Sequence, residues 1–261
     1  EKASASALAR FEREVQLTAS LSHPNTVSVF DYGHTPDGIF YYAMEYLEGT
    51  NLDALVRAHG PQPPARVVHV LKQVASALVE AHGIGLIHRD IKPENVILCE
   101  RGGIPDVAKV VDFGLVRDLE PASGARLTQA NVIHGTPLYL SPEAIRAPDA
   151  VDARSDVYGL GAVGYYLLTG THVFGGATTV EVCSHHLHTR PDPPSERLGR
   201  PVPAGLETLV LACLEKDPAL RPGSALELRD ALGALADVGH WSEKDAREWW
   251  ERWHEGRDKP A

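Results

Sequence analysis

Cysteine is scarce in this 261-residue sequence, where it occurs only as Cys99, Cys183 and Cys213. An odd number of widely spaced cysteines predicts neither a disulfide framework nor a four-thiolate metal site, and it favours a reducing compartment, the cytoplasm. Long hydrophobic runs are lacking too. The longest near-apolar stretch, residues 157–168, is interrupted by glycines, whereas a bilayer-spanning helix needs roughly 20 residues. We therefore expect no membrane segment in this chain.

Basic residues are fewer than acidic ones. Lys and Arg total 25 and Asp and Glu total 35, which gives a formal charge of −10. Such a surface is a poor electrostatic match to a nucleic acid backbone, so we expect no nucleic acid partner. The hydrophobic share of 43% and the charged share of 23% are those of an ordinary folded protein and argue against intrinsic disorder.

The first residues show a helical pattern. Leu8, Phe11 and Val15 recur at helical spacing and are followed by His23-Pro24. Because the residue before a proline disfavours helical backbone, the pattern predicts an amphipathic helix over residues 4–22.

Two antiparallel hairpins are predicted farther along the chain. Apolar stretches at residues 26–32 and 39–46 are separated by a Pro-Asp-Gly turn signal, and those at 96–99 and 107–111 by a Gly-Gly pair. Most of the chain after the first hairpin has helical periodicity, most clearly over residues 67–82.

The residues with the clearest chemistry lie on either side of the second hairpin. Residues 88–95 read HRDIKPEN and residues 112–114 read DFG, so folding of the hairpin brings Asp90, Asn95 and Asp112 close together. Carboxylate and carboxamide oxygens are ligands that suit Mg²⁺ beside substrate phosphates, and one carboxylate is left to accept a proton from a hydroxyl. The two motifs occur together and in this order, which argues against the interpretation that they are two unrelated turns.

These motifs resemble eukaryotic-like protein kinases, specifically the bacterial serine/threonine branch. Residues 88–95 look like the catalytic loop, and residues 112–114 look like the metal-binding start of the activation segment. The resemblance extends from about Leu8 to about Leu235. Before the catalytic loop, residues 11–14 and 23–25 resemble the C-helix region and residues 44–47 the hinge. After it, the matching motifs are the substrate-receiving stretch at 135–140, Ser-Pro-Glu at 141–143, the start of the central helix at 156–161 and the closing motif at 217–222.

The resemblance implies an α+β, bilobal protein-kinase-like fold. Residues 1–48 would form a partial N-lobe and hinge, made of the C-helix and antiparallel strands. Residues 49–238 would form a mainly helical C-lobe, and residues 239–261 a Trp-rich helical extension.

The resemblance also implies roles for individual residues, with ATP and Mg²⁺ as cofactors and proteins with Ser or Thr acceptors as substrates. Asp90 would accept or position the hydroxyl, Lys92 would neutralise the transferring phosphoryl group, and Asn95 and Asp112 would hold Mg²⁺. The residues implied to bind the nucleotide are Glu14, Met44, Glu45, Leu47 and Ile97. The backbone of Glu45 and Leu47 would meet adenine. The residues implied to be structural are Glu143, Asp156 and Arg221. Glu143 and Arg221 would pair with each other.

Regulation is expected in the segment of residues 115–143. Lys92 together with Thr136 favours a Ser or Thr acceptor over Tyr. Arg89, beside the catalytic Asp90, has no obvious carboxylate to pair with, so a phosphate on Thr128 could pair with it and order the segment. The alternative is that Thr128 is an ordinary surface threonine.

The sequence departs from the kinase pattern ahead of Glu14. A Gly-rich loop and a strand lysine are expected there, but residues 1–6 lack a strand-like pattern and Lys2 is the one lysine. The sequence begins with Glu1, so we expect its start to be a cut, the chain to lack its first N-lobe strands, and Glu14 to lack its counter-charge. A natural pseudokinase or scaffold is the main alternative, and a small-molecule kinase related to aminoglycoside phosphotransferases is another.

All four tryptophans fall within the last 21 residues. Ser242 and Asp245 have the spacing of a helix cap, and the residues that then share one face are Ala246, Trp249, Trp250 and Trp253. We expect this face to pack on the main domain, because an exposed Trp stripe is unfavourable. A partner-docking surface is the alternative.

A small group of potential metal ligands lies near residue 185. Cys183, His185, His186 and His188 share a predicted helix and could suggest zinc. We expect instead that the histidines lie on a solvated helix face.

Overall fold

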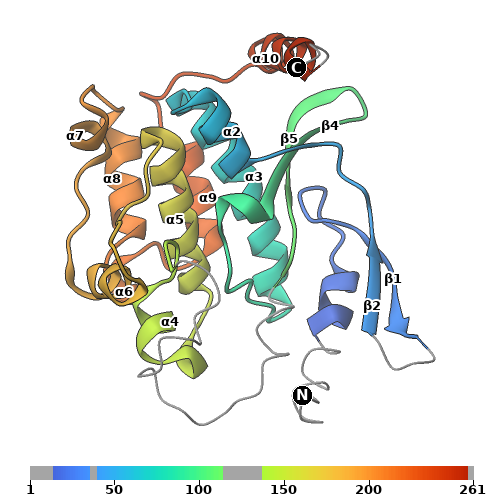
Figure 1. Ribbon diagram of the computed structural model, residues 1–261, viewed down its shortest axis with the longest axis horizontal. Helices are drawn as coiled ribbons and strands as arrows, with labels where there is room; N and C mark the ends of the chain where they lie inside the picture. The colour runs from blue at the N-terminus through green and yellow to red at the C-terminus, as the bar shows by residue number, and fades with distance from the viewer. Residues whose placement is uncertain (1–13, 36–39, 114–136, 258–261) are drawn as a thin grey trace.

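The computed structural model describes residues 14–35, 40–113 and 137–257 (Figure 1). Its first described residues, 14–20, are helical. Several short elements connect the main ones: β3 (Gly49–Asn51), η1 (Pro93–Asn95), α4 (Pro142–Arg146), η3 (Pro148–Ala150), α7 (Pro194–Leu198) and η4 (Pro218–Leu220). The main elements are β1 (Val29–His34), β2 (Phe40–Met44), α2 (Leu52–His59), α3 (Pro64–Gly83), β4 (Val96–Arg101), β5 (Ile104–Val110), α5 (Arg154–Thr169), α6 (Thr179–His188), α8 (Ala204–Cys213), α9 (Ala225–Gly233) and α10 (Glu243–Arg257).

The strands form two small antiparallel sheets beside a larger helical part (Figure 1). β1 pairs with β2, and β4 pairs with β5 and with the short β3. Both predicted hairpins are therefore confirmed. A parallel bridge between Thr26 and Val110 joins the segment before β1 to the end of β5, so the two sheets are linked through the backbone.

The helical part is built around α5. Every residue from Ser155 to Thr169 on this helix is buried, and α3 packs against both α5 and α9. Close packing depends on small residues, since a Cβ atom added to Gly161 would lie 2.4 Å from the Cβ of Cys213 on α8. The buried side of the 20-residue α3 carries the predicted apolar face. Within the described ranges, no helix is both long and apolar enough to cross a membrane.

The predicted N-terminal helix is described only in part. Residues 14–20 are helical, as expected, and the helix ends before Pro24; residues 4–13 of the prediction lie outside the described residues.

The C-terminal helix α10 packs on the domain with its tryptophan face, as expected. Ala246 and Trp250 are each 2% exposed. Ser242 caps the helix, because its hydroxyl accepts from the backbone N–H of Asp245 at 3.2 Å and donates to the Asp245 carboxylate at 2.6 Å.

The expectation for α6 was wrong at His186. This side chain is fully buried rather than solvated, and its Nδ1 lies 2.8 Å from the hydroxyl of Tyr158 on α5. Burial lowers the pKa of His186 to about 3, because an apolar environment disfavours the charged ring. The residue therefore contributes to packing as a neutral group.

Candidate active site

The loop of residues 88–95 is held by a buried carboxylate from the central helix. Asp156, in the first turn of α5, accepts from the backbone N–H groups of His88 and Arg89 at 2.9 and 2.8 Å and lies 2.8 Å from Nε2 of His82. Arg89 has a left-handed backbone, with φ of 65°, a conformation that bulky residues keep only when the surroundings impose it. Asp156 thus fixes the turn that presents Asp90.

The ring of His88 ties this loop to the residues after β5. It is fully buried, its Nε2 lies 3.0 Å from the carbonyl oxygen of Val111, and its centroid lies 4.7 Å from that of Phe113. Its Nε2 donates to that carbonyl and its Nδ1 accepts from the backbone N–H of Asp90 at 3.3 Å, the pattern of a neutral ring, and burial lowers the pKa of His88.

The sequence-predicted residues Asp90, Lys92 and Asn95 meet in the structure. Lys92 Nζ lies 2.6 Å from Asp90 Oδ2, and Asn95 Nδ2 donates to the same oxygen at 3.1 Å and to the Asp90 carbonyl at 3.0 Å. The Lys92 and Asp90 side chains are 35% and 39% exposed, so both reach solvent. Lys92 and Asn95 both bind Oδ2, so neither of them occupies the second carboxylate oxygen of Asp90.

Asp112 lies across the hairpin from Asn95. The backbone N–H of Val111 donates to the Asn95 carbonyl at 3.0 Å, which places Asp112, the residue after Val111, close to the turn at Pro93–Asn95. Asp112 has φ of 57°, and its Oδ1 accepts from the hydroxyl of Tyr42 at 3.3 Å. Burial, together with the negative charge of Asp112, raises the pKa of Tyr42.

The donor set at this point suits a hard divalent cation. Asp112 supplies a carboxylate, and Asn95 uses its amide nitrogen toward Asp90, which leaves its amide oxygen for a ligand. Magnesium prefers one or two such oxygens together with phosphate oxygens and water. These residues therefore fit Mg²⁺.

The predicted hinge begins at Met44, the last residue of β2, and continues beyond it. Met44 is 43% exposed, and Leu47 and Ile97 are half-buried. Glu45 is different, because it is buried and its carboxylate accepts from Lys109 Nζ at 2.7 Å, from the backbone N–H of Ser28 at 2.9 Å, and from Arg101. Sequence reasoning gave Glu45 a backbone role only. The missed signal is the pair of basic residues, Arg101 and Lys109, in the second hairpin.

The expectation for Arg89 and Glu14 was wrong. Arg89 Nη1 lies 3.4 Å from Glu14 Oε1, so Arg89 has a carboxylate neighbour and Glu14 has a counter-charge. The two residues are far apart in sequence, and folding of the helix at 14–20 against the catalytic loop brings them together. Among the described residues, the buried Nε of Arg89 has no hydrogen-bond partner.

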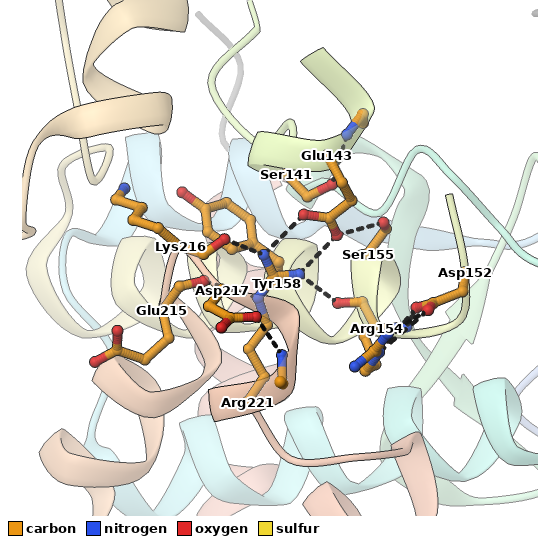
Figure 2. Close-up of polar contacts among 12 residues, drawn as sticks. Ser141, Glu143, Asp152, Arg154, Ser155, Tyr158, Glu215, Lys216, Asp217 and Arg221 are labelled. Atoms are coloured by element: carbon orange, nitrogen blue, oxygen red, sulfur yellow. Dashed lines mark hydrogen bonds and ion pairs between the residues drawn. The ribbon is translucent and has the colours of Figure 1, made fainter. Parts of the chain in front are cut away.

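Glu143 and Arg221 meet in a buried ion pair (Figure 2). Arg221 Nη1 and Nη2 donate to the two carboxylate oxygens at 2.7 and 2.8 Å, and Ser155 Oγ donates to Oε1 at 2.6 Å. Burial alone would raise the pKa of Glu143, but the hydrogen bonds from Arg221 and Ser155 outweigh it and hold the pKa below its usual value. Arg221 also donates to backbone carbonyls of Arg154 and Glu215, so it joins three segments.

The predicted regulatory residues Thr128 and Thr136 lie outside the described residues, which resume at Pro137. Tyr139, the first aromatic residue after that gap, has its hydroxyl 3.0 Å from Nδ1 of His172. The structure thus describes the end of the predicted substrate-receiving stretch and not its start.

Comparisons with known proteins give a consistent result. The sequence model described as the protein kinase domain matches residues 1–232. Serine/threonine-protein kinase pkn3 of Myxococcus xanthus is 41% identical over 232 residues, which are 87% of this chain and 42% of that protein. Serine/threonine-protein kinase PrkC of Bacillus subtilis is 37% identical over 235 residues, which are 90% of this chain and 35% of that protein. The chain therefore spans less than half the length of these relatives.

A solved structure agrees in fold. The crystal structure of Rad53 1–466 in complex with AMP-PNP superimposes with a TM-score of 0.69, at 24% identity, over 85% of this chain and 53% of that one. At this identity the likeness concerns the arrangement of elements alone.

Proposed function

The chain belongs to the protein kinase domain family, and from that premise we propose that it transfers the γ-phosphate of ATP to Ser or Thr residues of proteins. The observation that carries the proposal is the meeting of Asp90, Lys92 and Asn95 on one carboxylate, with Asp112 across the hairpin. Such a set positions a hydroxyl and a metal-bound phosphate, and phosphoryl transfer depends mostly on positioning and charge neutralisation. A cytoplasmic location goes with this proposal.

Each residue has a role that follows from its contacts. Asp90 would accept a hydrogen bond from the acceptor hydroxyl through the oxygen that Lys92 and Asn95 do not use, and a positioned base of this kind contributes roughly 10²–10⁴-fold. Lys92 would neutralise charge on the moving phosphoryl group. Asn95 and Asp112 would hold Mg²⁺, which supplies further charge neutralisation when bound.

The nucleotide would lie beside the hinge. The N–H of Glu45 donates to the carbonyl of Ser28 at 2.9 Å, so Glu45 would meet adenine through its own carbonyl oxygen, and Leu47 through its backbone. Met44 and Ile97 would supply apolar contact with the adenine ring. Glu14 would pair with a strand lysine that reaches the triphosphate.

The residues ahead of Glu14 limit this activity. The printed chain has Lys2 as its one lysine there, and the apolar side chains of the β1–β2 region are widely exposed, with Phe30 at 73% and Tyr46 at 85%. We propose that residues 1–261 alone transfer phosphate very slowly and aggregate through this region, whereas a form extended upstream by a phosphate-covering loop and a strand lysine is active. Equal rates for both forms would contradict this.

The experiment that tests the function is transfer of radiolabelled phosphate from ATP to a protein substrate, followed by phosphoamino acid analysis. The extended form should label Ser or Thr, and Asp90→Asn should lower the rate by roughly 10²-fold or more. A pseudokinase would bind a partner without labelling it. Full activity of Asp90→Asn would overturn the assignment of Asp90.

Regulation through Thr128 belongs to the same proposal. Arg89 contacts Glu14 at 3.4 Å, and its side chain is 37% exposed, so a phosphate on Thr128 could join this pair. Mass spectrometry after incubation with ATP should find phosphate on Thr128. A fully active Thr128→Ala variant would contradict the switch.

A further inference from the structure

The carboxylate of Asp106 on β5 is fully buried and is shared between the kinase core and the C-terminal extension. Arg66 donates to both oxygens at 2.8 and 2.7 Å, Trp241 Nε1 donates to Oδ2 at 2.8 Å, and Trp250 Nε1 donates to Oδ1 at 2.7 Å. An ionised carboxylate offers about four acceptor positions, so these four bonds complete its coordination. Two of the four come from beyond residue 232, where the family match ends.

α10 packs on the domain through directional polar contacts as well as apolar ones. The guanidinium carbon of Arg66 lies 4.0 Å from the ring centroid of Trp249 and 5.1 Å from that of Trp241, distances typical of cation–π contacts. Asp106 has φ of 53°, an uncommon conformation for a residue with a side chain. Register and orientation of α10 are thus fixed by a buried charge and by directional indole donors.

The same helix also contacts the tip of the hairpin formed by β4 and β5 (Figure 1). Arg247 Nη2 donates to the carbonyl of Gly103 at 3.1 Å, and His254 Nε2 lies 2.8 Å from Glu100 Oε2. These two contacts and the Asp106 bonds fall on β4, on the turn and on β5, so α10 spans the outer part of the hairpin.

The same hairpin carries the two cations that bind Glu45, Arg101 in its outer part and Lys109 farther along β5, opposite Ile97. Arg101, between Glu100 and the turn, pairs with Oε2 of Glu45, and Lys109 Nζ lies 2.7 Å from Oε1. Lys109 Nζ also donates to the carbonyl of Thr26 at 3.0 Å. The position of Glu45 at the hinge therefore depends on where the hairpin lies.

We propose that α10 is a positioning element for the nucleotide site, acting through the β4–β5 hairpin and Glu45. Trp241 and Trp250 are positioning residues, since they hold Asp106 and do not face the hinge. The inference rests on the proposed function, in which the backbone of Glu45 meets adenine. A looser hairpin would leave Glu45 less ordered, so adenine nucleotides would bind more weakly while the transfer step, which depends on Asp90 and Asp112, would be affected little.

The test is carried out in the full-length natural protein with two pairs of substitutions. Trp241→Phe with Trp250→Phe keeps the aromatic packing and removes both indole donors. Arg247→Ala with His254→Ala removes exposed contacts to the hairpin tip and poses little threat to folding, since these side chains are 53% and 50% exposed. Each pair should raise the Kd for ADP and the KM for ATP three- to tenfold, with kcat within twofold of the unmodified protein.

Lys244→Ala is the matched control, because Lys244 is 84% exposed on the same helix and pairs only with Glu248 among the described residues. It should leave the Kd for ADP unchanged. Adding Arg101→Gln to the Arg247 and His254 substitutions should raise the Kd less than the product of the separate effects, since both changes act on the same hairpin.

The outcomes separate the possibilities. If both pairs leave the Kd for ADP unchanged, α10 is a structural addition and the inference is wrong, even where the melting temperature falls. If the Trp pair does not fold, the exposed pair decides. If the unmodified protein does not bind ADP, the proposed function itself fails, and this inference fails with it.

Discussion

Arg221 binds Glu143 with both of its terminal nitrogens, at 2.7 and 2.8 Å, although 78 positions separate the two residues. The arginine side chain is fully buried and the glutamate side chain is 16% exposed. Glu143 stands at the start of α4, just after the stretch that leads away from the catalytic residues, and Arg221 follows η4. The pair therefore holds the end of that stretch against the helical lobe.

Removing one partner of this pair should destabilise the fold. We expect Arg221→Gln to lower the free energy of unfolding by about 3 kcal/mol, because a largely buried carboxylate would lose two charge-assisted hydrogen bonds. Urea unfolding measures this. Arg197→Gln is the control, since its partner Asp192 is 62% exposed and such pairs contribute under about 1 kcal/mol. Equal losses in both variants would contradict the assigned role of Arg221.

His186 should make stability depend on pH. Burial lowers its pKa from 6.5 to about 3 in the folded state, so between these values the unfolded chain binds one proton more. Stability then falls as the pH decreases from 6.5, by roughly 1.4 kcal/mol for each pH unit. Unfolding at pH 7 and pH 5 should show a loss of about 2 kcal/mol from this residue. His186→Gln should reduce the difference by that amount, and an unchanged pH dependence would show that another group is responsible.

The proximity of the candidate catalytic residues was predictable because it is local. Asp90, Lys92 and Asn95 lie within six positions of one another, and a single hairpin, β4–β5, brings Asp112 to them. Both hairpins and the face of α3 were predictable for the same reason, since alternation and helical spacing are properties of short windows.

Long-range ion pairs were not predictable from these patterns. Arg89 meets Glu14 across 75 positions, and Glu45 meets Lys109 across 64. Charged residues in such windows are usually solvated, and only packing decides which of them are buried with a partner. His186 was missed in the same way, because the spacing of α6 does not show which of its histidines faces Tyr158.

Glycines in α5 should be sensitive to added volume. A Cβ at position 161 would lie 2.4 Å from the Cβ of Cys213, so Gly161→Ala should force α5 and α8 apart and destabilise the protein by about 1–3 kcal/mol. Gly83→Ala, at the end of α3 with nothing within 4 Å of the added atom, is the control and should be neutral or slightly stabilising. Comparable melting temperatures for the two variants would contradict this account of the packing.

Asp112→Asn should slow phosphate transfer strongly without unfolding the protein. Asparagine tolerates the left-handed backbone seen at this position, with φ of 57°, and its oxygen can still accept from Tyr42, whereas alanine would add strain of about 1–2 kcal/mol. The substitution therefore removes one negative charge and exchanges a charged metal ligand for a weaker, neutral one while the shape is kept. We expect the rate of transfer from ATP in the full-length protein to fall at least roughly 10²-fold, because Mg²⁺ would be held less tightly, with the melting temperature unchanged within a few degrees. Asp149→Asn, at an exposed carboxylate in η3, should leave both quantities unaltered. A fully active Asp112→Asn enzyme would remove Asp112 from the metal site.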